Sequence, residues 1–122
     1  MARILVIDDE PALRELLQKA LTSAGYEAIL AEDGDEGLRL FIQAPADLVI
    51  VDLYMAGRDG MEIISDLRKR SPRLPLIAIS GRYLADELLG VTKLLGVKAT
   101  FKKPFVLAQL LVSVEEALSH ER

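Results

Sequence analysis

The stretch 46-ADLVIVDLYMAGRDG-60 decides how this chain folds and where its chemistry lies. Leu48 to Val51 is an unbroken run of β-branched and aliphatic residues with polar residues on either side. Such a run is too short for a helix of its own and is typical of a strand that is buried on both faces of a sheet. A carboxylate, Asp52, follows immediately. Because a strand with two apolar faces offers that acid few neighbours, we expect its partners to come from the ends of other strands.

Four other apolar runs resemble this one, and helical patterns lie between them. Strands are predicted at residues 4–7, 27–31, 48–51, 76–79 and 97–101, and helices at about 11–24, 35–43, 61–70, 84–95 and 105–119. Five strand–helix pairs in strict alternation, joined by short connections, indicate a parallel sheet with helices on both faces. We therefore predict an α/β fold, a flavodoxin-like doubly wound sheet in the order 2-1-3-4-5, with all 122 residues in a single domain.

Polar side chains follow the predicted strands at one edge of this sheet. Asp8 and Asp9 come directly after the first strand, Ser80 follows the fourth strand and Lys103 lies just beyond the fifth. In the order 2-1-3-4-5 the first and third strands are neighbours, which places the acid pair beside Asp52. Open parallel sheets bind ligands at this edge, so these side chains form the candidate site.

The crowding of Asp8, Asp9 and Asp52 predicts a bound cation. Three carboxylates close together repel one another, which raises at least one pKa unless a cation lies between them. Mg²⁺ prefers oxygen ligands and is commonly held by one or two carboxylates together with a phosphate, and Mn²⁺ is the alternative. With the ion and Lys103 neutralising a phosphoryl group, Asp52 can attack in line and become an aspartyl phosphate. Ser80 would then donate its hydroxyl to a phosphoryl oxygen.

Each of these residues also has a simple structural explanation. Acids at positions 8 and 9 suit the start of the following helix, because they complement the positive end of its dipole. Asp59 caps the third helix more readily than it joins the site, and Ser80 alone is a common turn residue. Separate explanations of this kind do not account for acids, a hydroxyl and a lysine at the same edge, so we interpret them as one site.

The composition argues against several other classes of protein. Hydrophobic residues make up 51% of the chain and charged residues 28%, which indicates a packed globular domain. A net charge of −4 argues against direct nucleic-acid binding, which needs clustered Lys and Arg. The lack of cysteine excludes disulfides and thiolate chemistry and is compatible with a reducing compartment. The first apolar run is too short for a signal peptide or a membrane span, so we expect a cytoplasmic protein without membrane contact.

The order of the motifs resembles the receiver domain of two-component response regulators, chemotaxis receivers among them. The resemblance covers nearly the whole chain and rests on Val6-Ile7-Asp8-Asp9-Glu10, Leu48-Val49-Ile50-Val51-Asp52-Leu53-Tyr54-Met55, Asp59-Gly60, Ile79-Ser80 and Lys103-Pro104-Phe105. It implies that Asp52 accepts a phosphoryl group from a sensor histidine kinase or a phosphotransfer protein. It also implies that Asp8, Asp9 and the backbone carbonyl of Tyr54 arrange Mg²⁺ at Asp52. Ser80 and Lys103 would contact the phosphoryl group, and the Lys103-Pro104 peptide would be cis.

Two positions depart from the family pattern. Ala56 stands where receivers usually have proline, and Thr100 stands where an aromatic residue commonly acts as a rotamer switch. Phe101 is adjacent to Thr100, but strand alternation points it to the other face of the sheet. We therefore expect signalling through the fourth helix and the fifth strand without an aromatic switch.

The predicted last helix carries more apolar residues than one core-facing stripe requires. The surplus is either an interface, such as a dimer through the fourth helix, fifth strand and fifth helix, or ordinary packing of an edge helix. A downstream protein target or an output domain would receive the signal.

Two other functions stay open at this point. A receiver-like docking module would bind partners without phosphorylation; Ala56 and Thr100 favour it, whereas the intact acids and Lys103 oppose it. An aspartate-nucleophile phosphohydrolase of the haloacid dehalogenase type shares the fold layout and the metal, but it needs Asp-x-Asp where this chain has Asp8-Asp9-Glu10. A receiver differs from that enzyme because it catalyses only its own phosphorylation and dephosphorylation.

Overall fold

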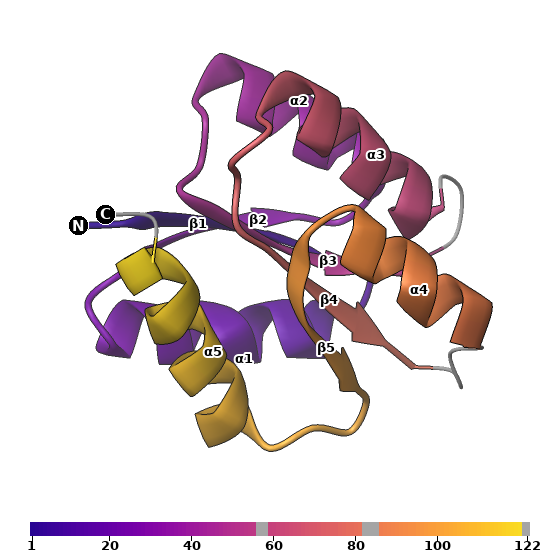
Figure 1. The fold of residues 1–122 in the computed structure, drawn as a ribbon. Coiled ribbons are helices and arrows are strands. Elements are labelled where there is room, and N and C mark those ends of the chain that lie inside the picture. The colour runs from indigo at the N-terminus through magenta and orange to yellow at the C-terminus, as the bar shows by residue number, and fades with distance from the viewer. Residues whose placement is uncertain (56–58, 82–85, 121–122) are drawn as a thin grey trace.

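In the computed structural model, which describes residues 1–55, 59–81 and 86–120, strands and helices alternate along the whole chain (Figure 1). The strands are β1 (Arg3–Ile7), β2 (Glu27–Ala31), β3 (Leu48–Asp52), β4 (Leu76–Ser80) and β5 (Val97–Lys102). The helices are α1 (Pro11–Ser23), α2 (Gly34–Gln43), α3 (Gly60–Arg70), α4 (Asp86–Leu94) and α5 (Leu107–His120). Within the described ranges, none of these helices has the length and apolar character of a membrane-spanning segment.

The strands form one parallel sheet in the order β2-β1-β3-β4-β5, which confirms the predicted order. β1 lies between β2 and β3, with Ile7 paired to Ala31 on one side and to Val51 on the other. Asp52, the last residue of β3, pairs with Ile79 of β4. Because all the strands are parallel, the segments that follow β1, β3, β4 and β5 leave the sheet at the same edge.

Helices cover both faces of this sheet, with α1 and α5 on one side and α2, α3 and α4 on the other (Figure 1). The core on the α1–α5 side is formed by the buried residues Ile4, Val6, Leu17, Leu21, Leu48, Ile50, Ile77, Ile79, Leu110, Val114, Ala117 and Leu118. The core on the other side takes the alternate residues of the same strands, such as Leu5, Ile7, Val49 and Val51, and packs them against α2 and α3. Burial on both faces explains why the central strands are continuous apolar runs.

The start of α2 differs by one residue from the sequence prediction. The helix begins at Gly34 rather than at Asp35, because Asp33 is its N-cap. The Asp33 side chain accepts a hydrogen bond from the backbone N of Glu36 at 2.8 Å and so satisfies a donor of the first helical turn.

The start of α5 also differs from the prediction. The helix begins at Leu107, two residues later than the predicted Phe105. The Phe105 ring packs against Phe101, with the ring centroids 6.1 Å apart, and both contact the core on the α1–α5 side. Phe105 therefore packs into the core from the segment that precedes α5.

A bulge in β5 sets which face its residues occupy. Leu76 of β4 pairs with Val97, and the next residue, Ile77, pairs with Ala99. Lys98 is therefore the extra residue of the bulge. Beyond the bulge, Phe101 packs with the core on the α1–α5 side, and alternation places Thr100 on the opposite face. The expectation that Phe101 points away from the Thr100 face is confirmed.

The side chain of Arg68, a residue of α3, holds the turn between α4 and β5 against α3 by hydrogen bonds. Its Nε donates to the backbone carbonyl of Leu95 at 2.7 Å, and its Nη2 donates to that of Gly96 at 3.4 Å. Its Nη1 donates to the carbonyl of Pro72 at 2.8 Å. This fork of hydrogen bonds fixes where β5 begins, and β5 leads directly to Lys103.

The start of α3 packs against the backbone that carries Asp52. Gly60, the first residue of α3, donates its backbone N–H to the carbonyl of Leu53 at 3.2 Å. A Cβ on Gly60 would overlap the carbonyl oxygen of Asp52 and lie 2.6 Å from the Cα of Leu53. Because both neighbours are backbone atoms that cannot move aside cheaply, only glycine allows this approach of α3 to β3.

We predict that Gly60→Ala lowers the free energy of unfolding by about 1–3 kcal/mol, because the added methyl group overpacks the end of β3. The matched control is Gly90→Ala in α4, where a Cβ would meet no atom within 4 Å. That variant should be more stable than the parent by about 1 kcal/mol at most, the helix-propensity gain of alanine. Urea unfolding measures both values, and equal effects of the two substitutions would contradict the close approach of α3 to β3.

Candidate functional site

Acidic side chains from two neighbouring strands meet at the carboxyl edge of the sheet. Carboxylate oxygens of Asp8, Asp9 and Asp52 lie within 4.8 Å of one another. We call these three residues the acidic cluster. Asp8 and Asp52 are buried, whereas Asp9 is exposed. The pairing of β1 with β3 therefore brings together the acids that the sequence places after separate strands.

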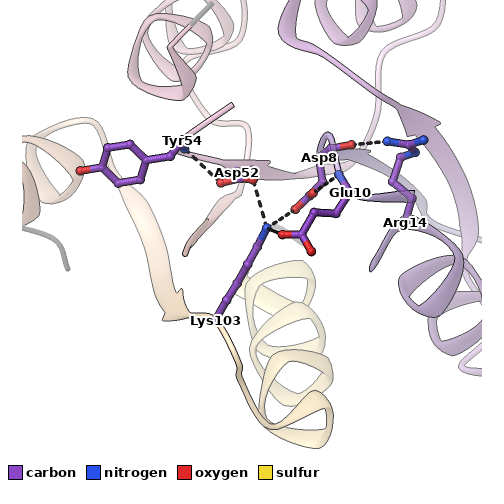
Figure 2. A network of polar contacts seen from close by, with 6 residues as sticks. All are labelled: Asp8, Glu10, Arg14, Asp52, Tyr54 and Lys103. Carbon is purple, nitrogen blue, oxygen red and sulfur yellow. Dashed lines mark hydrogen bonds and ion pairs between the residues drawn. The ribbon is translucent and has the colours of Figure 1, made fainter. Parts of the chain in front are cut away.

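Lys103 brings a positive charge to the acidic cluster. Its Nζ lies 3.1 Å from Oδ2 of Asp8 and 3.1 Å from Oδ2 of Asp52 (Figure 2). The same Nζ lies 2.6 Å from Oε1 of Glu10. The Lys103-Pro104 peptide is cis, as the resemblance to receiver domains implies. One ammonium group thus faces the carboxylate at the end of β3 and two carboxylates from the turn between β1 and α1.

Burial and these contacts shift the pKa values of Asp52 and Lys103. Burial raises the pKa of Asp52 because the loss of hydration outweighs the hydrogen bonds from Tyr54 and Lys103, and the charge of Asp8 adds to the rise. Burial lowers the pKa of Lys103, but the contacts of its ammonium group with the carboxylates of Glu10, Asp8 and Asp52 outweigh this effect, so this pKa is raised. Lys103 therefore stays charged at neutral pH, and Asp52 is more basic than an exposed aspartate.

Backbone hydrogen bonds orient the two buried acids. Oδ1 of Asp52 accepts from the backbone N of Tyr54 at 3.0 Å, and Oδ1 of Asp8 accepts from the backbone N of Glu10 at 2.8 Å. Arg14 of α1 donates to the backbone carbonyl of Asp8 at 2.7 Å and braces the turn between β1 and α1 (Figure 2). In each buried acid, the following turn holds Oδ1 while Oδ2 faces Lys103.

The acidic cluster has the chemistry of a divalent-cation site. Oδ2 of Asp8 is buried and accepts no hydrogen bond among the described residues, because its contact with Lys103 is an ion pair outside hydrogen-bond geometry. A buried oxygen with unused acceptor capacity is costly unless a cation or a donor reaches it. Carboxylate oxygens are the hard ligands that Mg²⁺ and Mn²⁺ bind. The residues present therefore fit a hard divalent cation.

The remaining predicted residues have the following places. Ser80 ends β4 and is buried, and its backbone carbonyl accepts a hydrogen bond from the backbone N of Lys103 at 2.7 Å. Asp59 is the N-cap of α3 and accepts a hydrogen bond from the backbone N of Met61 at 2.7 Å, which confirms its structural explanation. Ala56, the departure from the family pattern in the loop after β3, lies outside the described residues.

Two residues of this network, Glu10 and Arg14, are not predicted from the sequence. Glu10 is the N-cap of α1 but makes no side-chain cap hydrogen bond, and its carboxylate reaches Lys103 instead. Its place directly after the acid pair is the only signal that the sequence offers. Arg14 lies one helical turn after Glu10, a spacing that predicts an ion pair between the two. In the structure Arg14 bonds the Asp8 carbonyl and lies 3.9 Å from the carboxylate of Glu32.

Comparisons with known proteins agree with this arrangement. The family model of the response regulator receiver domain matches residues 4–115. The transcriptional regulatory protein GlrR of Escherichia coli K12 is 36% identical over 117 residues, which cover 96% of this chain and 26% of that protein. This chain therefore spans about a quarter of the length of that relative.

Two solved structures extend the comparison. A CheY-like receiver domain protein from Methanospirillum hungatei JF-1 is 27% identical with a TM-score of 0.93, and the match covers 98% of this chain and 95% of that chain. TrrA of Thermotoga maritima, solved in complex with Mg²⁺ and BeF, is 34% identical with a TM-score of 0.83, and the match covers 96% and 99%. The sheet order, the acidic cluster and these matches together show that the chain belongs to the response regulator receiver domain family, the signalling domains of two-component systems.

Proposed function

We propose that Asp52 accepts a phosphoryl group from a sensor histidine kinase or a phosphotransfer protein, and that this phosphorylation carries the signal. The observation behind the proposal is the buried carboxylate of Asp52, which lies between two other acids and Lys103 at the open edge of the sheet. A carboxylate with a raised pKa is a stronger nucleophile than an exposed aspartate, and Lys103 is close enough to offset the charge of a phosphoryl group.

The proposed reaction is a direct phosphoryl transfer. A carboxylate oxygen of Asp52 attacks the phosphorus atom, the bond from phosphorus to the histidine nitrogen of the donor breaks, and the nitrogen keeps the bonding electrons. The acidic cluster, with the backbone carbonyl of Tyr54, would hold Mg²⁺ or Mn²⁺, which when bound would offset the charge of the phosphoryl oxygens. The Ser80 hydroxyl would donate a hydrogen bond to one of these oxygens, and Lys103 would pair with another. The Mg²⁺ and BeF bound by TrrA support this chemistry.

The domain would catalyse only its own phosphorylation and dephosphorylation and would act on other proteins through a change of shape. We infer that residues 1–122 are one receiver domain and that its target is a protein or an output domain, since the relative GlrR is a transcriptional regulatory protein of which the match covers 26%. Three exposed apolar residues, Leu94 of α4, Val106 just before α5 and Val112 of α5, support a dimer through α4, β5 and α5. The net charge of −4 argues against direct DNA contact by this domain. The lack of cysteine is compatible with the proposed cytoplasmic location.

Incubation with acetyl phosphate and Mg²⁺ should add the mass of one phosphoryl group to the intact protein. The adduct should be absent from Asp52→Asn, because the amide is not a nucleophile for phosphorus. Asp47→Asn is the matched control, since Asp47 precedes the same strand at the opposite edge of the sheet and is exposed. Intact mass spectrometry measures the adduct, and chelation of Mg²⁺ should suppress it in the parent and in the control.

Other outcomes of the same experiment separate the competing functions. If the parent protein stays unmodified while Mg²⁺ is present, a docking module that acts without phosphorylation becomes the better account. Steady turnover of many phosphomonoesters without a lasting adduct would favour a phosphohydrolase. An adduct of equal size in Asp52→Asn would place the acceptor at another residue and overturn the assignment of Asp52.

The raised pKa of Asp52 predicts how stability depends on pH when divalent cations are chelated. Because this pKa is higher in the folded than in the unfolded chain, ionisation of Asp52 costs stability, and the loss develops as pH rises through the folded-state pKa. Asp52→Asn should therefore be more stable than the parent at pH 7, and the difference should shrink toward pH 4. Urea unfolding at both pH values tests this, and a variant that is less stable than the parent at pH 7 would show that the charge of Asp52 is favourable in the fold.

A further inference from the structure

We propose that Glu10 is a positioning residue that competes with the phosphoryl group for Lys103. In the unphosphorylated domain its carboxylate holds the ammonium group, and it is the partner that Lys103 gives up when a phosphoryl group arrives at Asp52. The inference rests on the proposed function, because the competition requires phosphoryl binding at Asp52.

The first argument is that three carboxylates already surround the ammonium group of Lys103. Its Nζ donates hydrogen bonds to Glu10 at 2.6 Å and to Asp52 at 3.1 Å, and it forms an ion pair with Asp8 at 3.1 Å (Figure 2). An ammonium group has three N–H donors, so two of them are already engaged. A phosphoryl oxygen that approaches Lys103 therefore competes with these carboxylates for its ammonium group.

The second argument is that Glu10 is the partner that can withdraw most easily. The side chains of Asp8 and Asp52 are 0% and 2% exposed, so each would be left as a buried charge without its lysine. The side chain of Glu10 is 57% exposed, so water can solvate it as soon as it leaves. The exchange of partners at Lys103 should therefore occur at Glu10.

The third argument is that the side chain of Glu10 does not cap its own helix. It occupies the N-cap of α1, where a short acidic or hydroxyl side chain normally bonds the first amides of a helix, yet it makes no such bond. Its carboxylate instead makes the shortest of the three contacts with Lys103, at 2.6 Å between Oε1 and Nζ. A charge-assisted contact of this length competes directly with a phosphoryl oxygen.

The test is the affinity of the domain for beryllofluoride, a tetrahedral stand-in for the phosphoryl group, in the presence of Mg²⁺, measured by fluorine NMR. Glu10→Gln should bind beryllofluoride about two- to fivefold more tightly than the parent, the range for loss of a competing, partly exposed ion pair. The gain should fade as salt is raised, because salt screens the contact in the parent. Glu15→Gln, which removes the same charge from an exposed position on α1, should bind like the parent.

A second variant distinguishes competition for Lys103 from simple repulsion of an anionic ligand. Glu10→Asp keeps the negative charge but shortens the side chain by about 1.5 Å, one carbon–carbon bond. Aspartate is also a preferred N-cap residue, so its carboxylate should turn to the amides of α1. If Glu10 acts by holding Lys103, this variant should bind beryllofluoride more tightly than the parent, as Glu10→Gln does.

The outcomes are separable. Unchanged or weaker binding by Glu10→Gln would overturn the inference, and urea unfolding of each variant shows whether the fold is intact. Tighter binding by Glu10→Gln alone, with Glu10→Asp like the parent, would also overturn it, because charge and not the contact with Lys103 would be the cause. Failure of the parent and of every variant to bind beryllofluoride with Mg²⁺ would instead overturn the proposed function.

Discussion

The charge balance around Lys103 is the constraint on which this site depends. Two buried carboxylates from neighbouring strands would repel each other in a region that water barely reaches. The ammonium group of Lys103 lies 3.1 Å from each of them and reduces their mutual repulsion. The pKa of Asp52 is still raised, chiefly by burial. Lys103 therefore compensates the charge of the two buried carboxylates only in part. A divalent cation at the acidic cluster would supply the remaining positive charge, and together with Lys103 it would offset the charge of a phosphoryl group.

The order of the strands is what creates this constraint. Asp8 and Asp52 are far apart in the sequence and meet only because β1 and β3 are neighbours in the sheet. Lys103 arrives from β5, whose start is fixed by the hydrogen bonds of Arg68 and whose end is fixed by the bond from the Lys103 backbone N to the Ser80 carbonyl. The apolar cores on the two faces of the sheet thus serve to hold a few charged groups at one edge. A shift of β3 by one residue would carry Asp52 away from that edge.

Much of this arrangement is predictable from the sequence. The run from Leu48 to Asp52 is buried on both faces in the structure, as its lack of a polar face indicates. The alternation of strands and helices then indicates a doubly wound parallel sheet, and the order 2-1-3-4-5, which is common among such sheets, places the acids beside one another.

What the sequence does not reveal depends on individual side chains. Nothing in the periodicity of α1 says that Glu10 turns to Lys103 instead of capping the helix, because both partners are long side chains with many rotamers. The late start of α5 depends on the contact between Phe105 and Phe101, and the bulge at Lys98 depends on pairing with β4. These are tertiary effects that override local propensity.

The most direct test of the central claim is the free energy of unfolding measured as a function of Mg²⁺ concentration. If the acidic cluster binds the cation only when the fold brings its members together, stability should rise with Mg²⁺, by about 1.4 kcal/mol for each tenfold increase above the dissociation constant. The rise should be absent when Asp8 and Asp9 are both replaced by asparagine. A free energy of unfolding that does not change with Mg²⁺ in the parent protein would contradict the claim that these acids form a cation site.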